Sequence, residues 1–114
     1  MPTFFFGLKS CDSCRAALKT IDASGLSVEV RDVRDDGVPR DVLGRALDEL
    51  GADAVINRRS TTWRGLDEAE RAGDPVALMV AYPALMKRPL IMHENGKLTV
   101  GWDARARATL GIGG

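Results

Sequence analysis

Two cysteines, Cys11 and Cys14, carry the most distinctive chemistry of this 114-residue sequence. The segment Cys-Asp-Ser-Cys predicts one sulfur at the start of a helix and the other three residues later on the same face, close enough for a disulfide. The pair therefore suits reversible oxidation, in which Cys11 attacks an electrophile. Cys14 would then resolve the resulting mixed disulfide.

The two thiols are expected to differ in acidity. Amide groups and the positive dipole end at a helix N-terminus stabilise a thiolate, so we expect the pKa of Cys11 to lie below the free value of about 8.5. Cys14 lies further into the helix and is expected to be less acidic. Lys9 and Arg15 are expected to add positive field.

Two other interpretations of the cysteines remain. A closed zinc site usually needs four ligands, and His93 is the only further thiol or imidazole donor, so we expect no metal. The cysteines could also be an inert buried pair, since buried cysteine is common. Reactive thiols recur where a strand leads through a loop into a helix, which favours redox or nucleophilic chemistry at Cys11. We assign no role to His93.

Arginines form the second candidate group. Arg58, Arg59 and Arg64 surround Ser-Thr-Thr-Trp, and Arg88 immediately precedes Pro89. Guanidinium groups beside the Cys11 loop would bind carboxylates or oxyanions and keep a thiolate ionised. Each arginine alone is typical of a solvated or salt-bridged surface. Together with a reactive thiol, they indicate substrate binding.

Composition limits the classes of function. Sixteen Lys plus Arg balance sixteen Asp plus Glu, which disfavours binding to nucleic acid. No run approaches the roughly 18 apolar residues of a membrane span, and the opening segment lacks the features of a signal peptide. We therefore expect a cytoplasmic chain without a membrane association. Two cysteines in a reducing compartment are more often redox-active or metal-binding than structural.

Periodicity and capping residues predict the elements that position these side chains. Leu26, Val28 and Val30 alternate with polar residues and predict a strand with one buried face. Asn95-Gly96 between two apolar runs predicts a hairpin. The predicted strands are 3–6, 26–31, 90–93 and 98–100, and the predicted helical segments are 12–24, 39–51, 65–72, 76–86 and 103–110. The order βαβ, helices, ββα predicts a small α/β sandwich.

Four segments, in this order, resemble the ArsC and Spx superfamily, which includes arsenate reductases. The match spans almost the whole chain, and the Thr-Thr-Trp-Arg element is most similar to the YffB branch, regarded as glutathione-dependent thiol reductases. The segments are Gly-Leu-Lys-Ser-Cys-Asp-Ser-Cys-Arg at 7–15, Ile-Asn-Arg-Arg-Ser-Thr-Thr-Trp-Arg at 56–64, Met-Lys-Arg-Pro-Leu-Ile at 86–91 and Val-Gly-Trp-Asp at 100–103.

The resemblance implies a single thioredoxin-like domain over residues 1–114. Its four-stranded mixed sheet would combine βαβ and ββα halves, with a helical insertion at about 38–88. The resemblance further implies that Cys11 is the nucleophile and that Arg88 and Pro89 lie at the active site, where a cis Arg88-Pro89 peptide would bring backbone near the thiol. Arg59 fits the family's other arginine position best, and Arg58 is the alternative.

The function implied is a thiol-disulfide oxidoreductase with no bound cofactor and glutathione as cosubstrate. Its partners would be glutathione or another thiol or disulfide substrate, with glutaredoxin as a candidate partner. Two alternatives remain open. One is a true arsenate reductase, although arsenate reductases of the family carry a further arginine where this chain has Gly-Trp-Asp at 101–103. The other is an Spx-like regulator, because a cysteine at position 14 is typical of Spx regulators, which sense oxidation and bind the RNA polymerase alpha subunit.

Overall fold

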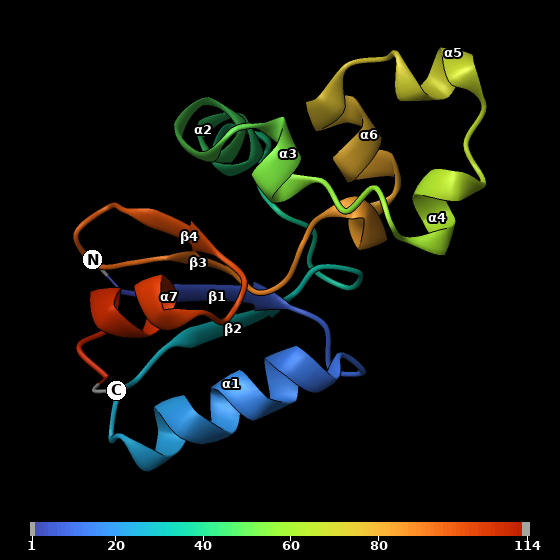
Figure 1. Cartoon of the computed structure of the whole chain (residues 1–114). Coiled ribbons are helices and arrows are strands. Elements are labelled where there is room, and N and C mark those ends of the chain that lie inside the picture. Colours follow the sequence, from blue (N-terminus) through green and yellow to red (C-terminus); the bar gives the residue numbers. More distant parts are fainter. Residues whose placement is uncertain (1, 113–114) are drawn as a thin grey trace.

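A four-stranded mixed sheet forms the centre of the computed structural model, which describes residues 2–112 (Figure 1). The strands lie in the order β2-β1-β3-β4; β1 and β2 are parallel, and β3 is antiparallel to both β1 and β4. This is the predicted thioredoxin-like sheet, built from a βαβ half and a ββα half. The strands are β1 Phe4–Gly7, β2 Glu29–Asp32, β3 Leu90–Met92 and β4 Leu98–Val100. Residues 1 and 113–114 of the expected domain lie outside the described residues.

The alternation of side chains along β1 divides the core in two. Phe5 points to one face, where it packs with Ile91 and with Ala17 and Ile21 of helix α1, Asp12–Ala23. Phe6 belongs to the other face, which the helical insertion covers. Figure 1 accordingly places α1 and the insertion on opposite sides of the sheet. The loop from β1 into α1, which carries Cys11, therefore lies where the two layers meet.

Between β2 and β3 the chain forms the insertion. Helix α2 buries Val42, Leu43 and Ala46, as its amphipathic pattern predicts, and Asp74 caps α6 by accepting a hydrogen bond from the amide of Ala77. The insertion comprises α2 Arg40–Leu50, α3 Ala52–Val55, α4 Thr61–Arg64, α5 Glu68–Arg71, α6 Pro75–Ala81 and the 3-10 turn η1 Pro83–Leu85.

Two helical predictions within the insertion were too long. The helix expected over 76–86 ends at Ala81, because Pro83 lacks an amide donor and disfavours the helical conformation at Tyr82. The segment 65–72 is helical only over 68–71, after a capping box formed by Asp67 and Glu70. The short helices α3 and α4 were not predicted.

The expected buried face of the second strand was also wrong for two of its three residues, since only Val28, which is partly buried, packs against the core. Leu26 precedes β2 and is 39% exposed, and Val30 within it is 45% exposed. These side chains are exposed because β2 is an edge strand that pairs only with β1. The next residue of this segment that is fully buried in the core is Val33, which follows β2. On β2 itself, the Arg31 guanidinium lies 5.6 Å from the centre of the Phe4 ring.

The C-terminal ββα segment, from β3 to α7, agrees with prediction. The β3–β4 hairpin turns at Asn95-Gly96, and helix α7, Ala104–Thr109, begins after Asp103, whose carboxylate accepts from the amide of Ala106. His93 is buried, and its Nε2 lies 2.8 Å from the hydroxyl of Thr99.

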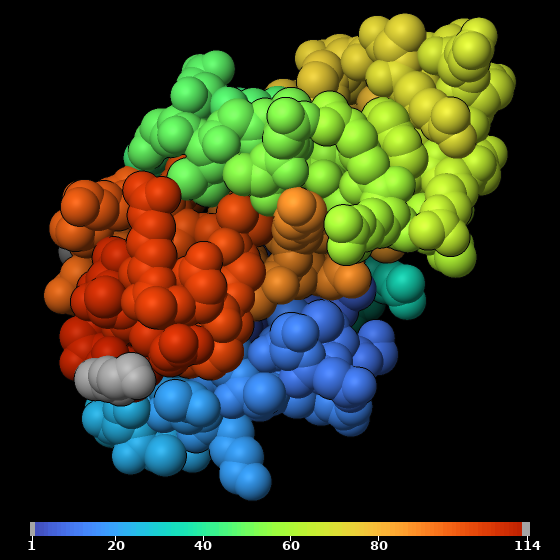
Figure 2. Space-filling view, viewed as in Figure 1, coloured from blue at the N-terminus to red at the C-terminus, as the bar shows by residue number. Residues whose placement is uncertain are grey.

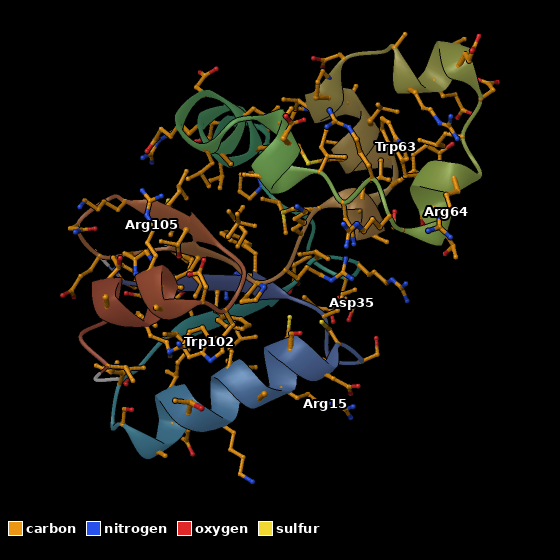
Figure 3. All side chains as sticks on the ribbon, viewed as in Figure 1. Arg15, Asp35, Trp63, Arg64, Trp102 and Arg105 are labelled. Atoms are coloured by element: carbon orange, nitrogen blue, oxygen red, sulfur yellow. The ribbon has the colours of Figure 1, made fainter. Side chains whose placement is uncertain are left out.

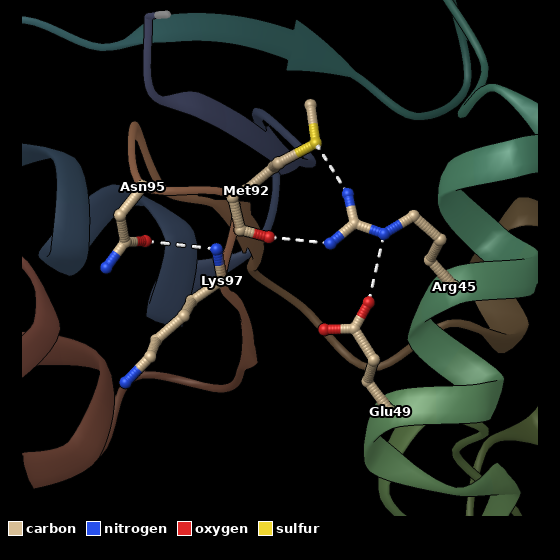
Figure 4. Close-up of polar contacts among 6 residues, drawn as sticks. Arg45, Glu49, Met92, Asn95 and Lys97 are labelled. Carbon is tan, nitrogen blue, oxygen red and sulfur yellow. Dashed lines mark hydrogen bonds and ion pairs between the residues drawn. The ribbon is translucent and has the colours of Figure 1, made fainter.

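One side chain ties the insertion to this hairpin. Arg45 of α2 donates a 2.6 Å hydrogen bond to the carbonyl oxygen of Gly96 and pairs with Glu49 at 2.9 Å (Figure 4). Its guanidinium also lies 3.9 Å from the sulfur of Met92.

Among residues 2–112, none of the helices combines the length and apolar character that a membrane crossing needs.

Candidate active site

A cleft of about 550 Å³ opens beside Cys11, between the start of α1 and the insertion. Its lining combines one thiol, one carboxylate and four cationic side chains. The lining residues are Cys11, Ser13, Asp53, Ile56, Asn57, Arg58, Arg59, Lys87, Arg88 and Gly101. The structure therefore brings together four of the six predicted site residues: Cys11, Arg58, Arg59 and Arg88. The other two, Cys14 and Pro89, lie in the protein interior.

Cys11 is the N-cap residue of α1 and is partly exposed. Burial tends to raise the pKa of its thiol, but the backbone amide and thiol of Cys14 and the Arg88 guanidinium together bring the pKa below its ordinary value. All three favour the charged form of the sulfur. The position can therefore present a thiolate to the cleft.

Cys14 has the opposite environment. Its side chain is 1% exposed and packs among Phe5, Ala17 and Ile21. Burial, with a smaller contribution from the neighbouring Cys11, raises the pKa of Cys14 to about 11. The predicted order of acidity agrees with the structure, and both cysteines are free thiols.

Close packing at the end of β1 fixes the position of Cys14. A Cβ atom at Gly7 would lie 2.8 Å from the Cys14 sulfur and 2.9 Å from the Phe5 ring. Both neighbours are buried, so only glycine fits here without displacing them. Gly7 thus lets the second thiol pack directly against the strand below Cys11.

Arg88 is the cation that acts on the Cys11 thiol. Its Nη1 atom donates to the carbonyl oxygens of Ala84 and Met86, each at 3.0 Å. Its Nε atom is buried and has no hydrogen-bond partner among residues 2–112. The peptide bond to the buried Pro89 is cis, as the family resemblance implies. Arg88 is thus anchored at one end of its guanidinium and keeps an unused donor.

A short antiparallel contact brings the other cations to Arg88. Ile56 pairs with Met86, the amide of Asn57 donates to Leu85, and the amide of Lys87 donates to Val55, both bonds measuring 2.7 Å. The contact holds the segment that contains residues 58–59 beside the segment that contains residues 87–88, and both segments line the cleft. This pairing between distant segments explains why both motifs are needed for one site.

Arg58 and Arg59 both face the cleft, so the structure retains both predicted alternatives. Arg58 pairs with Asp53, and its guanidinium lies 5.7 Å from the centre of the Trp63 ring. Arg71 lies 5.7 Å from the same ring and donates to the Trp63 carbonyl oxygen. Trp63 thus helps to position Arg58.

The expected contribution of Lys9 and Arg15 is corrected by the structure. Arg15 forms an ion pair with Asp12, and Figure 3 shows it on the side of α1 that faces away from the insertion. Lys9 is exposed, and neither residue lines the cleft. Among the cations that line the cleft, Arg88 is the one that lowers the pKa of Cys11.

Sequence reasoning missed Lys87 and Asp53 as cleft residues. The Lys87 ammonium donates to the Asp53 carbonyl oxygen at 3.2 Å, which links the two segments beside the cleft. The position of Lys87 next to Arg88 was a usable signal, whereas nothing near Asp53 in sequence indicated its role. Within the part of the chain that the structure describes, no group of three or more His, Cys, Asp or Glu could hold a metal ion.

Comparison with known proteins shows the family of this chain. The model of the ArsC family matches residues 6–109. The chain belongs to the ArsC family. It is 33% identical over 104 residues to an uncharacterized protein of Haemophilus influenzae, covering 88% of this chain and 90% of that protein.

Two solved structures extend the comparison. A structure named YFFB protein is 33% identical, with a TM-score of 0.83 over 93% of this chain and 96% of that one. An arsenate reductase (ArsC) related protein from Brucella melitensis is 30% identical, with a TM-score of 0.69 over 98% of this chain and 97% of that one. The similarity to YFFB confirms the relation to the YffB branch, and this ArsC-family chain has a thiol-oxidoreductase-like fold.

Proposed function

We propose that this protein is a thiol-disulfide oxidoreductase in which Cys11 is the nucleophile and glutathione the cosubstrate. One observation carries the proposal: a partly exposed thiol with a lowered pKa lies in the same cleft as Arg58, Arg59, Lys87 and Arg88. A thiolate is the reactive form of cysteine, and cationic groups both stabilise it and attract anionic substrates.

The reaction proceeds by two exchanges at sulfur. The Cys11 thiolate attacks one sulfur of a substrate disulfide, forming a mixed disulfide and releasing the other half as a thiolate. A glutathione thiolate then attacks the Cys11 sulfur and releases the second half of the substrate. A second glutathione attacks the bound glutathione sulfur, so one substrate disulfide and two glutathione thiols yield two substrate thiols and glutathione disulfide.

Glutathione fits the charge and size of the cleft. It has two carboxylates and a central thiol, and guanidinium groups bind carboxylates through paired hydrogen bonds. The volume of about 550 Å³ lies within the usual range of small-molecule sites, roughly 300–1,000 Å³. Holding the tripeptide by its charged ends would orient its sulfur toward Cys11.

Cys14 provides a second route for resolution. Its thiol lies next to Cys11, so it could attack the Cys11 sulfur of a mixed disulfide, forming a Cys11–Cys14 disulfide and releasing glutathione. With a pKa of about 11, only roughly one Cys14 in ten thousand would be ionised at pH 7. Free glutathione would therefore compete effectively as the attacking thiol.

Turnover of this kind belongs to a reducing compartment, which we propose to be the cytoplasm.

Mass measurement after exposure to glutathione disulfide tests the assignment of the nucleophile. The reduced wild type, Cys11→Ser and Cys14→Ser are compared on the intact protein. We expect no adduct on Cys11→Ser and a stable glutathione adduct on Cys14→Ser. An adduct that persists without Cys11 would refute its role as nucleophile.

The two alternative functions give different results. A redox sensor would form the Cys11–Cys14 disulfide and change its affinity for an RNA polymerase subunit with little turnover, which a pull-down under oxidising and reducing conditions measures. An arsenate reductase would consume arsenate when supplied with glutathione and glutaredoxin. Catalytic reduction of a disulfide without either result supports the proposed function.

A further inference from the structure

A second hollow of about 370 Å³ adjoins the Cys11 cleft, between α2 and the start of α7. We call it the Arg105 hollow. Charged residues of both signs line it: Glu49, Lys87, Asp103 and Arg105. In Figure 2 the green insertion and the orange-red C-terminal elements meet along a recess on this face of the molecule.

The two hollows share Lys87 and Gly101 in their linings. Gly101 has a φ of +84°, and a Cβ atom built there would have no other atom within 4 Å. The space above this residue is therefore open, and no side chain at position 101 stands between the hollows. A ligand whose sulfur meets Cys11 could extend across Gly101 into the Arg105 hollow.

The charges of the two hollows differ. The Cys11 cleft has four cationic side chains and one carboxylate, and that carboxylate pairs with Arg58. The Arg105 hollow has two cations and two carboxylates, of which Glu49 also pairs with Arg45 and Asp103 also caps α7. A simple carboxylate suits the first environment. A group that carries both an ammonium and a carboxylate suits the second.

Arg105 is the distinctive cation of the second hollow. Its side chain is exposed and forms no ion pair or hydrogen bond within residues 2–112. Figure 3 shows it projecting from α7 toward α2, on the side of the Arg105 hollow. A guanidinium without a protein partner remains available for a ligand carboxylate.

We propose that the Arg105 hollow binds the γ-glutamyl end of glutathione, with Arg105 and Lys87 holding its carboxylate and Glu49 and Asp103 facing its ammonium. The glycyl carboxylate would then lie with Arg58 and Arg59 in the Cys11 cleft. This inference rests on the proposed function, and it makes Arg105 a determinant of specificity for the γ-glutamyl group. A tripeptide spans about 10 Å, long enough to enter both hollows from a central sulfur.

The test crosses protein variants with disulfide substrates. Wild type, Arg105→Gln, Arg105→Lys and the exposed α1 control Lys19→Gln are reacted with the disulfides of glutathione, γ-glutamylcysteine and cysteinylglycine. The measured quantity is the rate constant for mixed-disulfide formation at Cys11. Thermal melts check that each variant is folded.

We expect wild type to prefer the two γ-glutamyl substrates. Arg105→Gln should slow these two about fivefold to tenfold and change the cysteinylglycine reaction less than twofold, since only the former lose a charged contact. Arg105→Lys should retain most of the preference, and Lys19→Gln all of it. Equal effects on all three substrates, or none, would overturn the inference while leaving the oxidoreductase intact. A wild type that reacts equally fast with all three disulfides would also overturn the inference, whereas a wild type that forms no mixed disulfide at Cys11 with any of them would reject the proposed function.

Discussion

Replacing Arg88 by glutamine should change how fast Cys11 reacts and how that rate depends on pH. Arg88 stabilises the Cys11 thiolate through both a hydrogen bond and its charge. A hydrogen bond to a charged group is worth about 1.5–3 kcal/mol, and we take the lower end because Cys11 is partly exposed. A loss of about 1.5 kcal/mol lowers the ionisation constant of the thiol about tenfold.

Two opposing effects then set the rate. At a pH where both proteins are mostly protonated, the variant has about one tenth of the thiolate. Each thiolate is about threefold more nucleophilic, since reactivity rises with basicity with a coefficient of about 0.4–0.5. The net rate should fall about threefold at low pH and rise about threefold at high pH, where both thiols are ionised. The two pH profiles should therefore cross.

The assay follows release of the chromophore from 4,4′-dithiodipyridine, an uncharged disulfide that avoids a direct effect of Arg88 on substrate binding. Arg88→Lys keeps a positive charge and should lie between wild type and Arg88→Gln. Arg40→Gln, at an exposed position outside the cleft, should match wild type. Profiles of Arg88→Gln and wild type that superimpose, or that differ by one constant factor at every pH, would refute the role assigned to Arg88.

Three further predictions concern packing and charge. Gly7→Ala should lower the free energy of unfolding by about 2 kcal/mol, because the new methyl meets Cys14 and Phe5. Gly44→Ala in α2, where the space around the glycine is open, should instead raise the free energy of unfolding by about 0.5–1 kcal/mol. Urea unfolding compares the two variants, and equal effects would contradict the packing described at Gly7. Between pH 9 and about pH 11 the free energy of unfolding should fall by about 2–3 kcal/mol. The Cys14 thiol binds its proton more tightly in the folded than in the unfolded protein, and this stabilisation is lost as the pH rises through the folded pKa. The same loss in Cys14→Ala would disprove the assignment to Cys14. Trp63→Leu should weaken glutathione binding a few-fold, because the Arg58 guanidinium loses the aromatic ring that positions it. Trp63→Phe keeps an aromatic ring and should retain most of the glutathione affinity. Calorimetry that finds both variants equal to wild type would contradict the positioning role of Trp63.

Local signals in the sequence were sufficient for several helices and turns of the fold. The cap at Asp103, the Asn95-Gly96 turn and the apolar pattern of α2 each act within a few residues, so they could be predicted without the fold. The exposure of Val30 could not be predicted, because period-two alternation of apolar residues does not distinguish an edge strand from a central strand.

The site was predictable in part for the same reason. The acidity of Cys11 depends partly on its own helix, which the Cys-Asp-Ser-Cys segment indicates. The places of Lys87 and Asp53 depend on the contact of Ile56 with Met86, which joins segments thirty residues apart in sequence. The Arg105 hollow likewise forms only when α7 and α2 come together. These features arise from tertiary packing and have no local signature.

The central claim is that Cys11 is ionised more readily than an ordinary cysteine, and titration of the thiolate absorbance measures this most directly. The Cys14→Ser variant isolates the single remaining thiol while keeping a hydrogen-bond donor beside it, and should show Cys11 ionising below the ordinary value of about 8.5, with an Arg88→Gln background moving the transition upward. A Cys11 thiol that stays protonated up to or beyond that pH would contradict the account.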